Sequence, residues 1–140
     1  MIYMKYLIIG LGEFGKTLAE ELTENSNEVI GIDINEHKVN MIKDRISVSY
    51  ILDATDPAAL SQLPLKEMDC AIVAIGQSLD SSLRCVAALK ENKLPKIYAR
   101  AVDKAHMSIL KAMDIQHIFI PEIYAAREYA HNIDSPESLL

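Results

Sequence analysis

Short apolar runs alternate along this chain with longer amphipathic segments. The apolar runs predict strands near 4–9, 28–32, 47–52, 69–75, 96–100 and 117–120. The segments between and after them predict helices near 13–25, 36–45, 56–62, 79–91, 104–113 and 122–133. Uninterrupted apolar strands that alternate with helices are typical of βαβ units, in which helices cover both faces of a parallel sheet.

The expected fold is therefore α/β, a Rossmann-like doubly wound parallel sheet of six strands in the order 3-2-1-4-5-6, with helices on both faces. In the first helix, Phe14, Leu18 and Leu22 recur at i, i+4 and i+8, so we expect this stripe to lie on the sheet. Residues 1–134 are predicted to form one domain. Residues 135–140 read as a linker or as the start of a C-terminal lobe.

A glycine-rich turn follows the first apolar run. Gly10 favours a tight turn, Gly12 lets the backbone approach a phosphate, and Gly15 lets the next helix pack on the sheet. A phosphate at the start of that helix would meet unpaired N–H groups and the positive end of the helix dipole. Asp33 ends the second strand, 18 residues beyond Gly15, where it can accept hydrogen bonds from ribose hydroxyls. These residues predict a dinucleotide-type binding site.

The residues around Asp33 also predict which nucleotide binds. Its carboxylate would repel a 2′-phosphate, and the residues that follow, Ile34, Asn35 and Glu36, include no arginine that could accept one. We therefore expect NAD(H) or AMP, ADP or ATP as the ligand, and not NADP.

An acid–Ala–Thr turn follows the third strand. Asp53, Ala54 and Thr55 precede Asp56 and Pro57, where a helix is predicted to begin. The bland interpretation is that this turn only caps that helix, through Thr55 or Asp56. In a sheet of order 3-2-1-4-5-6 the turn also lies at the adenine side of the site. Asp53 is therefore the candidate for a contact with the base.

The fourth strand ends at Ile75 and Gly76, beside the first strand, where the strand order reverses. Ligands of open α/β sheets bind at this switch point. Gln77, Ser78 and Asp80 follow, and each of them either caps the next helix or reaches the ligand.

Two charged residues near the ends of later strands complete the candidate set. Arg100 ends the fifth strand, and it either binds a phosphate or forms a surface ion pair. Glu122 follows Pro121 at the start of the last helix, where an acid is favourable for the helix dipole alone.

Charge and cysteine content exclude several classes of partner. The net charge is −6, which opposes attraction to nucleic acid or to an anionic membrane. The apolar runs are far shorter than the roughly 20 residues of a membrane span. Cys70 and Cys85 fit neither a zinc pattern nor a redox motif, and we expect both in the core. A cytosolic protein without a nucleic-acid partner and without direct membrane insertion is expected.

Six motifs together resemble one family, the regulator-of-potassium-conductance N-terminal domains, also called KTN or TrkA-N domains. The resemblance extends from Tyr6 to about His131. The motifs are Ile9-Gly10-Leu11-Gly12-Glu13-Phe14-Gly15, Gly31-Ile32-Asp33-Ile34-Asn35, Asp53-Ala54-Thr55, Val73-Ala74-Ile75-Gly76, Ala99-Arg100-Ala101 and Ile120-Pro121-Glu122. The first is common to Rossmann domains, and the combination at these spacings is much more specific.

The resemblance implies a regulatory protein rather than an enzyme. Such domains bind NAD(H) or an adenine nucleotide, assemble as homodimers and in some cases as higher rings, and control a Trk- or Ktr-like potassium-transport subunit in the membrane. The chain is then expected in the cytoplasm, held at the inner face of the membrane through that partner.

The resemblance also assigns site residues. The glycines serve the phosphates, Asp33 holds the ribose, the Asp-Ala-Thr turn lies along the base, Arg100 contacts a phosphate or the ribose, and Glu122 lies at a dimer interface that in some relatives holds a divalent cation. The full expected cofactor-binding set is Gly10, Leu11, Gly12, Glu13, Phe14, Gly15, Asp33, Ile34, Asn35, Asp53, Ala54, Thr55, Ile75, Gly76 and Arg100.

The chain departs from the family at position 13 and in its length. Glu13 stands where several nucleotide-sensing relatives carry arginine, and its carboxylate disfavours a triphosphate such as ATP. The resemblance covers only the N-terminal domain of such proteins and does not extend to the smaller C-terminal lobe that is usual in the family. Two alternatives stay open, namely the cofactor-binding half of an NAD-dependent oxidoreductase and a scaffold that has lost its ligand. The first requires a catalytic pair beside the nicotinamide, and no His-Asp or Tyr-Lys pair is found there.

Overall fold

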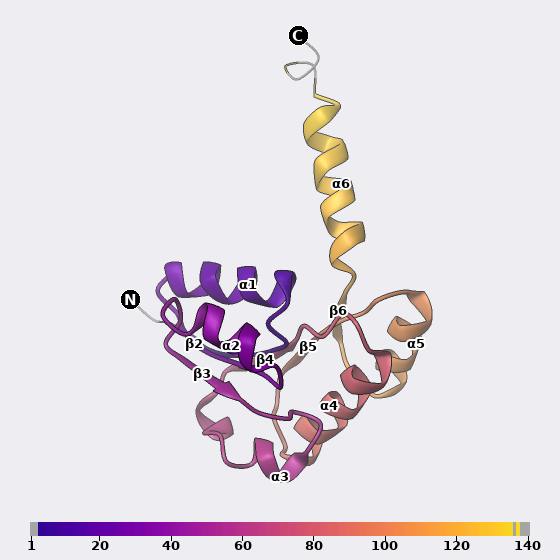
Figure 1. Ribbon diagram of the computed structural model, residues 1–140. Coiled ribbons are helices and arrows are strands. Elements are labelled where there is room, and N and C mark those ends of the chain that lie inside the picture. Colours follow the sequence, from indigo (N-terminus) through magenta and orange to yellow (C-terminus); the bar gives the residue numbers. More distant parts are fainter. Residues whose placement is uncertain (1–2, 136, 138–140) are drawn as a thin grey trace.

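A computed structural model describes residues 3–135 and 137 of the chain, and its centre is a six-stranded parallel sheet (Figure 1). The strands are β1 (Lys5–Ile9), β2 (Glu28–Asp33), β3 (Val48–Ile51), β4 (Cys70–Val73), β5 (Ile97–Arg100) and β6 (His117–Phe119). The helices are α1 (Glu13–Glu24), α2 (Glu36–Ile42), α3 (Pro57–Leu60), α4 (Leu79–Glu91), α5 (Lys104–Ala112) and α6 (Pro121–Ile133), and a short 3₁₀ helix covers Leu65–Glu67.

The strand order is β3-β2-β1-β4-β5-β6, so the predicted order and the predicted parallel pairing are both confirmed. The chain builds the sheet outwards from β1 to β3 and then returns to pair β4 with β1, where Ile9 lies opposite Val73. Helices α1 and α2 lie on one face, and α3, α4 and α5 lie on the other (Figure 1). The 3₁₀ turn is the one element that the sequence pattern did not predict, because three residues are too few to show a period.

Each face of the sheet has its own apolar cluster, as the alternation of side chains along a strand requires. Leu7 and Ile9 of β1 belong to the cluster beneath α4 and α5, which also contains Leu89 and Leu110. Ile8, between them, belongs to the cluster beneath α1 and α2. Because both faces of β1 and β4 are buried, their carboxyl ends have fixed positions in the middle of the fold.

The prediction for the buried face of α1 is partly wrong. Its buried residues are Gly15 and Ala19, whereas Leu18 and Leu22 are only partly buried at the edge of the cluster. Phe14 packs on Phe119, a partly buried residue at the border of the same cluster, with ring centroids 5.3 Å apart. The physical reason is close approach: α1 begins so near to β1 that only small side chains fit between helix and sheet.

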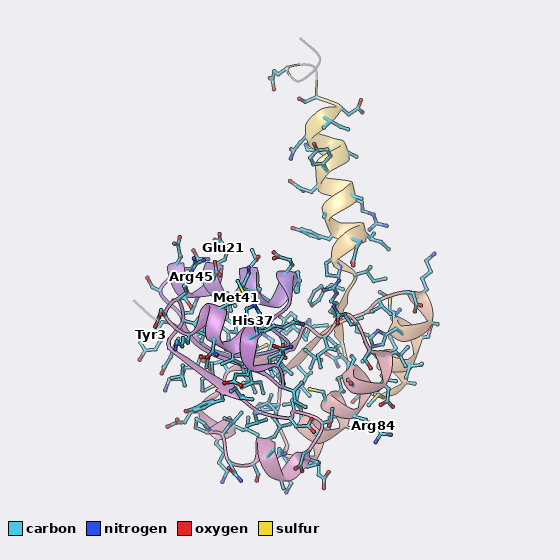
Figure 2. The ribbon with its side chains drawn as sticks, in the orientation of Figure 1. Tyr3, Glu21, His37, Met41, Arg45 and Arg84 are labelled. Carbon is cyan, nitrogen blue, oxygen red and sulfur yellow. The ribbon has the colours of Figure 1, made fainter. Side chains whose placement is uncertain are left out.

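Helix α6 forms where it was predicted, but it projects away from the sheet (Figure 1). It has no buried residue within its span, and beyond its first turn, where Glu122 pairs with Arg100 of β5, the helix projects clear of the other elements (Figure 2). Ile123 is 39% exposed and Ile133 is 53% exposed. Most of the expected linker, 135–140, falls outside the described residues. Among residues 3–135 and 137, no helix combines the length and the hydropathy that crossing a bilayer requires.

Candidate nucleotide-binding site

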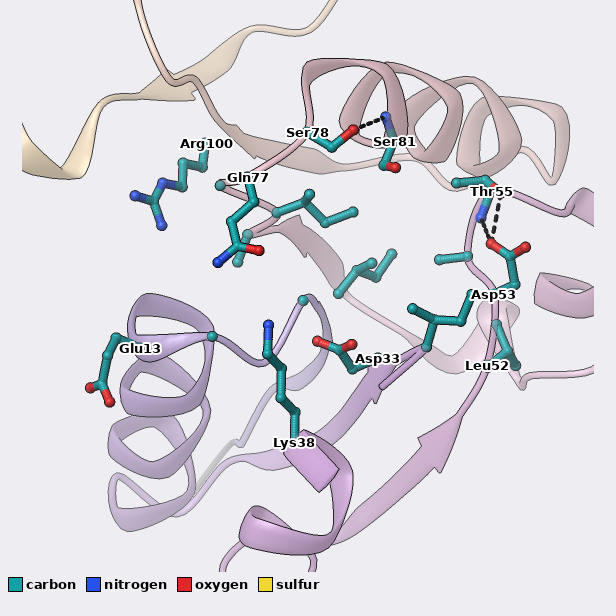
Figure 3. Close-up of a pocket in the computed structure, with 18 residues that line it drawn as sticks. Glu13, Asp33, Lys38, Leu52, Asp53, Thr55, Gln77, Ser78, Ser81 and Arg100 are labelled. Carbon is teal, nitrogen blue, oxygen red and sulfur yellow. Dashed lines mark hydrogen bonds between the residues drawn. The ribbon is translucent and has the colours of Figure 1, made fainter. Parts of the chain in front are cut away.

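A cavity of about 520 Å³ opens at the carboxyl ends of β1 and β4, where the strand order reverses (Figure 3). The glycine turn and Asp33 form one side of it, the turn after β3 forms a second, and the segment from Ala74 to Ser81 with Arg100 forms a third. Its size lies within the usual range of small-molecule sites, roughly 300–1,000 Å³. The switch point is thus hollow, as the sequence predicted.

The glycine turn is fixed by backbone geometry. Gly10 has φ of +97°, a left-handed conformation that side chains disfavour, and its N–H donates to the carbonyl oxygen of Ile32 at 2.9 Å. A Cβ on Gly15 would overlap the carbonyl oxygen of Gly10. A Cβ on Gly12, the residue that begins α1, would meet nothing within 4 Å. Gly12 therefore leaves open space at the helix N-terminus, where a phosphate is favoured.

The Asp33 carboxylate joins the end of β2 to the glycine turn. Its Oδ2 accepts the N–H of Leu11 at 2.8 Å, and its Oδ1 accepts the N–H of Asn35 at 2.8 Å. The Asn35 side chain in turn caps α2 by accepting the N–H of Lys38 at 3.1 Å. A carboxylate has about four lone-pair sites, so each oxygen of Asp33 can accept a further hydrogen bond from a ligand hydroxyl.

In the turn after β3, different residues cap helix α3 and line the cavity. Asp56 caps α3, since its side chain accepts the N–H of Ala58 at 3.0 Å. Asp53 Oδ1 instead accepts the N–H of Thr55 at 3.0 Å and its hydroxyl at 2.6 Å. Asp53, Ala54 and Thr55 all line the cavity. Capping of α3 alone therefore does not account for the position of this turn at the cavity.

The Arg100 side chain forms the ion pair considered for it, and its contact with a phosphate stays a prediction. Its Nη2 donates to Glu122 Oε1 at 2.9 Å, and its guanidinium lies 5.7 Å from the centroid of the Phe14 ring. It also lines the cavity. Its Nε is buried and has no hydrogen-bond partner among residues 3–135 and 137. A buried donor without an acceptor is costly, but this atom is shielded, so a ligand acceptor reaches it only if the side chain shifts.

Gly76 gives Arg100 its room, and this predicts the outcome of a substitution. In Gly76→Ala the new Cβ would approach the guanidinium carbon to 2.8 Å, so the flexible arginine must move. We expect the free energy of unfolding to fall by less than about 1 kcal/mol, because the far end of a side chain yields cheaply. We expect nucleotide affinity to fall about fivefold through the displaced guanidinium. Urea unfolding and calorimetric titration measure the two effects, and unchanged affinity would exclude Arg100 from ligand contact.

Four of the expected cofactor-binding residues do not line the cavity, and neither does Glu122, which was expected at a dimer interface. Leu11 is buried in the core beneath α1, and Gly15 serves helix packing. Phe14 packs on Phe119, Asn35 caps α2, and Glu122 pairs with Arg100. These residues support the walls of the site.

Lys38 was missed by the sequence reasoning. It lines the cavity, and its side chain extends from the first turn of α2 towards the space between the glycine turn and Asp33 (Figure 3). A search for a cation directly after Asp33 overlooks Lys38, which comes five positions later in the sequence. The cap of α2 brings it beside Asp33 in the fold.

The cysteines are not reactive groups of this site. Burial raises the pKa of Cys70 to about 11 and the pKa of Cys85 to about 12, so both thiols stay protonated at neutral pH. No group of three or more His, Cys, Asp or Glu side chains suited to a metal ion occurs within the described part of the chain. The expected cation at Glu122 would require residues from a second copy and stays a prediction.

The sheet order, the glycine turn and the acid at the end of β2 define a Rossmann-type α/β domain with its site at the switch point. The chain belongs to the TrkA-N domain family, whose sequence model matches residues 6–121. It is 37% identical over 131 residues to the Ktr system potassium uptake protein C of Bacillus subtilis, covering 94% of this chain and 59% of that protein. It is 33% identical over 118 residues to the Ktr system potassium uptake protein A of the same organism, covering 84% and 53%. The chain thus spans little more than half the length of these relatives.

Solved structures agree on the fold. The TrkA-N domain of the inner membrane protein ybaL from Escherichia coli superposes with a TM-score of 0.78 at 18% identity, covering 95% of this chain and 98% of that one. The AMP-bound Kef C-terminal domain of Shewanella denitrificans gives 0.71 at 20% identity, with 96% and 85% covered. The GsuK channel bound to NAD gives 0.70 at 17% identity, with 86% and 22% covered.

Proposed function

We propose that this chain is the nucleotide-sensing domain of a regulatory subunit that controls a membrane potassium transporter or channel. The observation that carries the proposal is the convergence of three features on one cavity: the open helix N-terminus at Gly12, the carboxylate of Asp33 and the cationic side chain of Arg100. They suit the phosphate, the ribose and a further acceptor of an adenine nucleotide. The match to potassium uptake proteins supports the regulatory role.

The charges around the cavity support NAD(H), AMP or ADP as the ligand. Asp33 repels a 2′-phosphate, which disfavours NADP, although Lys38 offsets part of that repulsion. Glu13 disfavours ATP, but its side chain is 90% exposed and lies 3.5 Å from Lys16, so water and this neighbour weaken its effect. Selection against NADP is therefore proposed to be stronger than selection against ATP.

The exposed α6 supports assembly as a homodimer, which in a complete protein forms part of a higher ring. Exposed large apolar side chains lie along α6, at Ile123, Tyr124, Tyr129 and Ile133. On the α1 side of the sheet, Tyr98 and Phe119 are only partly buried. Covering both surfaces with a second copy would bury apolar area that is otherwise in water. In this arrangement the domain acts in the cytoplasm, at the inner face of the membrane, through its transport partner.

A sensor works if the nucleotide binds two arrangements of the dimer with different affinity. The ligand then shifts the balance between them, and the membrane partner responds to that shift. Such a mechanism needs no catalytic group. The charged side chains of the cavity already have binding or structural roles, and we propose that the chain is not an enzyme.

The melting temperature of the purified domain tests this function. We expect NAD⁺, NADH, AMP or ADP to raise it and NADP⁺ to leave it unchanged, since a ligand that binds only the folded state stabilises it by mass action. At a hundred times its dissociation constant a ligand adds about 2.7 kcal/mol, or roughly 10 °C for a domain of this size. No shift with any nucleotide would favour the scaffold alternative. Turnover of NADH with a carbonyl substrate would favour the oxidoreductase alternative.

A further inference from the structure

His106 is a histidine of α5 that is fully buried and lies outside the cavity lining. Both of its ring nitrogens have partners. The N–H of Val102 lies 3.0 Å from Nδ1, and the hydroxyl of Ser82 lies 3.1 Å from Nε2. An imidazole held in this way has a defined protonation state.

The partners determine that state. The backbone N–H of Val102 can only donate, so Nδ1 must accept and carries no proton. A neutral imidazole with a free Nδ1 carries its proton on Nε2, which therefore donates to the Ser82 hydroxyl oxygen. Protonation would put a hydrogen on Nδ1 directly against the N–H of Val102. The charged form is thus incompatible with the observed contact.

Both partners lie outside the cavity lining but close in sequence to residues that line it. Val102 follows Arg100 by two residues, and Ala101 between them donates its N–H to the carbonyl oxygen of Phe119 at 2.8 Å. Ser82 lies in the first turn of α4, next to Ser81, which lines the cavity. The N–H of Ser82 donates to the carbonyl oxygen of Ser78 at 3.0 Å. His106 therefore joins the strand end that carries Arg100 to the start of α4.

We infer that His106 is a positioning residue whose neutral ring holds Arg100 and the first turn of α4 in register, so that protonation of His106 lowers the affinity of the cavity for nucleotide. This inference rests on the proposed function, because it presumes that the cavity binds a nucleotide. It adds to that function a sensitivity to acid pH, located outside the ligand contacts.

The charges near His106 set the direction of the effect. Burial lowers its pKa below the ordinary 6.5, and the carboxylate of Asp103, which caps α5 by accepting the His106 N–H at 2.8 Å, opposes this in part. From α4 the ring meets the uncharged Ser82, and Cys85 one turn further along is kept neutral by its raised pKa of about 12.

Two charged pairs involve the neighbouring elements α4 and β5. Arg84 lies 3.0 Å from Asp80 on the surface of α4, and Arg100 is paired with Glu122. The pKa of His106 is lower in the folded domain than in the unfolded chain, so the neutral ring contributes fully to folding stability above pH 6.5. This contribution is lost as the pH falls through the pKa of the folded domain.

Calorimetric titration with AMP and with NAD⁺ at several pH values between about 5 and 8 tests the inference. We expect wild-type affinity to be constant above pH 6.5 and to fall only as the pH drops through the lowered pKa of His106, by at most about tenfold per pH unit for a single proton. His106→Asn retains an acceptor for the Val102 N–H but cannot bind a proton, so we expect it to flatten the acid limb. His106→Gln lacks the acceptor near Val102, so we expect it to weaken binding about tenfold at every pH. His37→Asn, at an exposed position on α2 (Figure 2), is the control and should keep the wild-type profile.

A readout without nucleotide separates this inference from the proposed function. In the free domain, nitrogen NMR should find Nδ1 of His106 unprotonated at pH 7.5, and the Val102 amide should lose protection from hydrogen exchange as the ring titrates. If nucleotides fail to bind at pH 7.5, the proposed function is wrong. The NMR readout still tests whether the neutral His106 ring holds the Val102 amide. A proton on Nδ1 at pH 7.5, or an acid limb that persists in His106→Asn, would overturn the inference.

Discussion

Replacing Gly15 with alanine is expected to disrupt the glycine turn and to abolish nucleotide binding. The added Cβ would overlap the carbonyl oxygen of Gly10 and come within 3.2 Å of the Ala74 side chain. Neither backbone nor buried side chain can yield there, because Gly10 is fixed by its bond to Ile32. We expect a loss of about 3 kcal/mol in the free energy of unfolding, the upper range for overpacking in a core. Urea denaturation of the purified domain measures it.

Gly12→Ala is the matched control, three residues earlier in the same turn. Its Cβ would meet nothing within 4 Å, and its φ of −71° suits any residue. We expect a change in the free energy of unfolding of about 1 kcal/mol or less, the difference between glycine and alanine at a helix N-cap. Nucleotide affinity should still fall, since the methyl group would occupy the space proposed for a phosphate. Full stability of Gly15→Ala would contradict the packing described for α1, and full affinity of Gly12→Ala would exclude a phosphate from this turn.

Replacing Asp33 with alanine is expected to weaken nucleotide binding about a hundredfold, equal to about 2.7 kcal/mol. The variant loses the acceptor proposed for the ribose hydroxyls and also the bonds that hold the N–H groups of Leu11 and Asn35. The glycine turn would therefore be less well ordered for the phosphate. Calorimetric titration of the variant with AMP measures the change.

Asp69→Ala separates the loss of ligand contact from the loss of a structural carboxylate. Asp69 Oδ2 accepts the N–H of Lys5 at 2.8 Å, at the amino end of β1, so it makes a similar bond at the opposite end of the same strand. We expect a modest loss of stability, about 1 kcal/mol, and an unchanged affinity for AMP. Equal affinities for AMP in the two variants would exclude Asp33 from the ligand site.

The sheet and most of the site could be predicted because local rules and the global fold agree along this chain. The central strands are buried on both faces over residues 7–9 of β1 and over all of β4, so these stretches are apolar and end where turn residues begin. The glycines at positions 10 and 15 are required by backbone geometry. Sequence patterns report such requirements directly.

Features that depend on contacts between distant segments could not be predicted. Ser82 and His106 are 24 residues apart, and neither belongs to a recognisable motif. The packing of Phe14 on Phe119 depends on the distance between α1 and the sheet. The amphipathic periodicity of the sequence does not predict that distance. The direction of α6 was unpredictable for the same reason, because a periodic stripe predicts a helix but not the surface that covers it.

Mapping of AMP binding by NMR on the isotope-labelled domain tests the central claim most directly. The account predicts saturable shifts concentrated at the amides of Gly10 to Glu13, Asp33 to Asn35, Asp53 to Thr55 and Gly76 to Ser81. Shifts concentrated instead around the second cavity of about 360 Å³, which Lys90, Lys96 and His117 line at the other end of the sheet, would contradict it, as would the absence of any saturable shift.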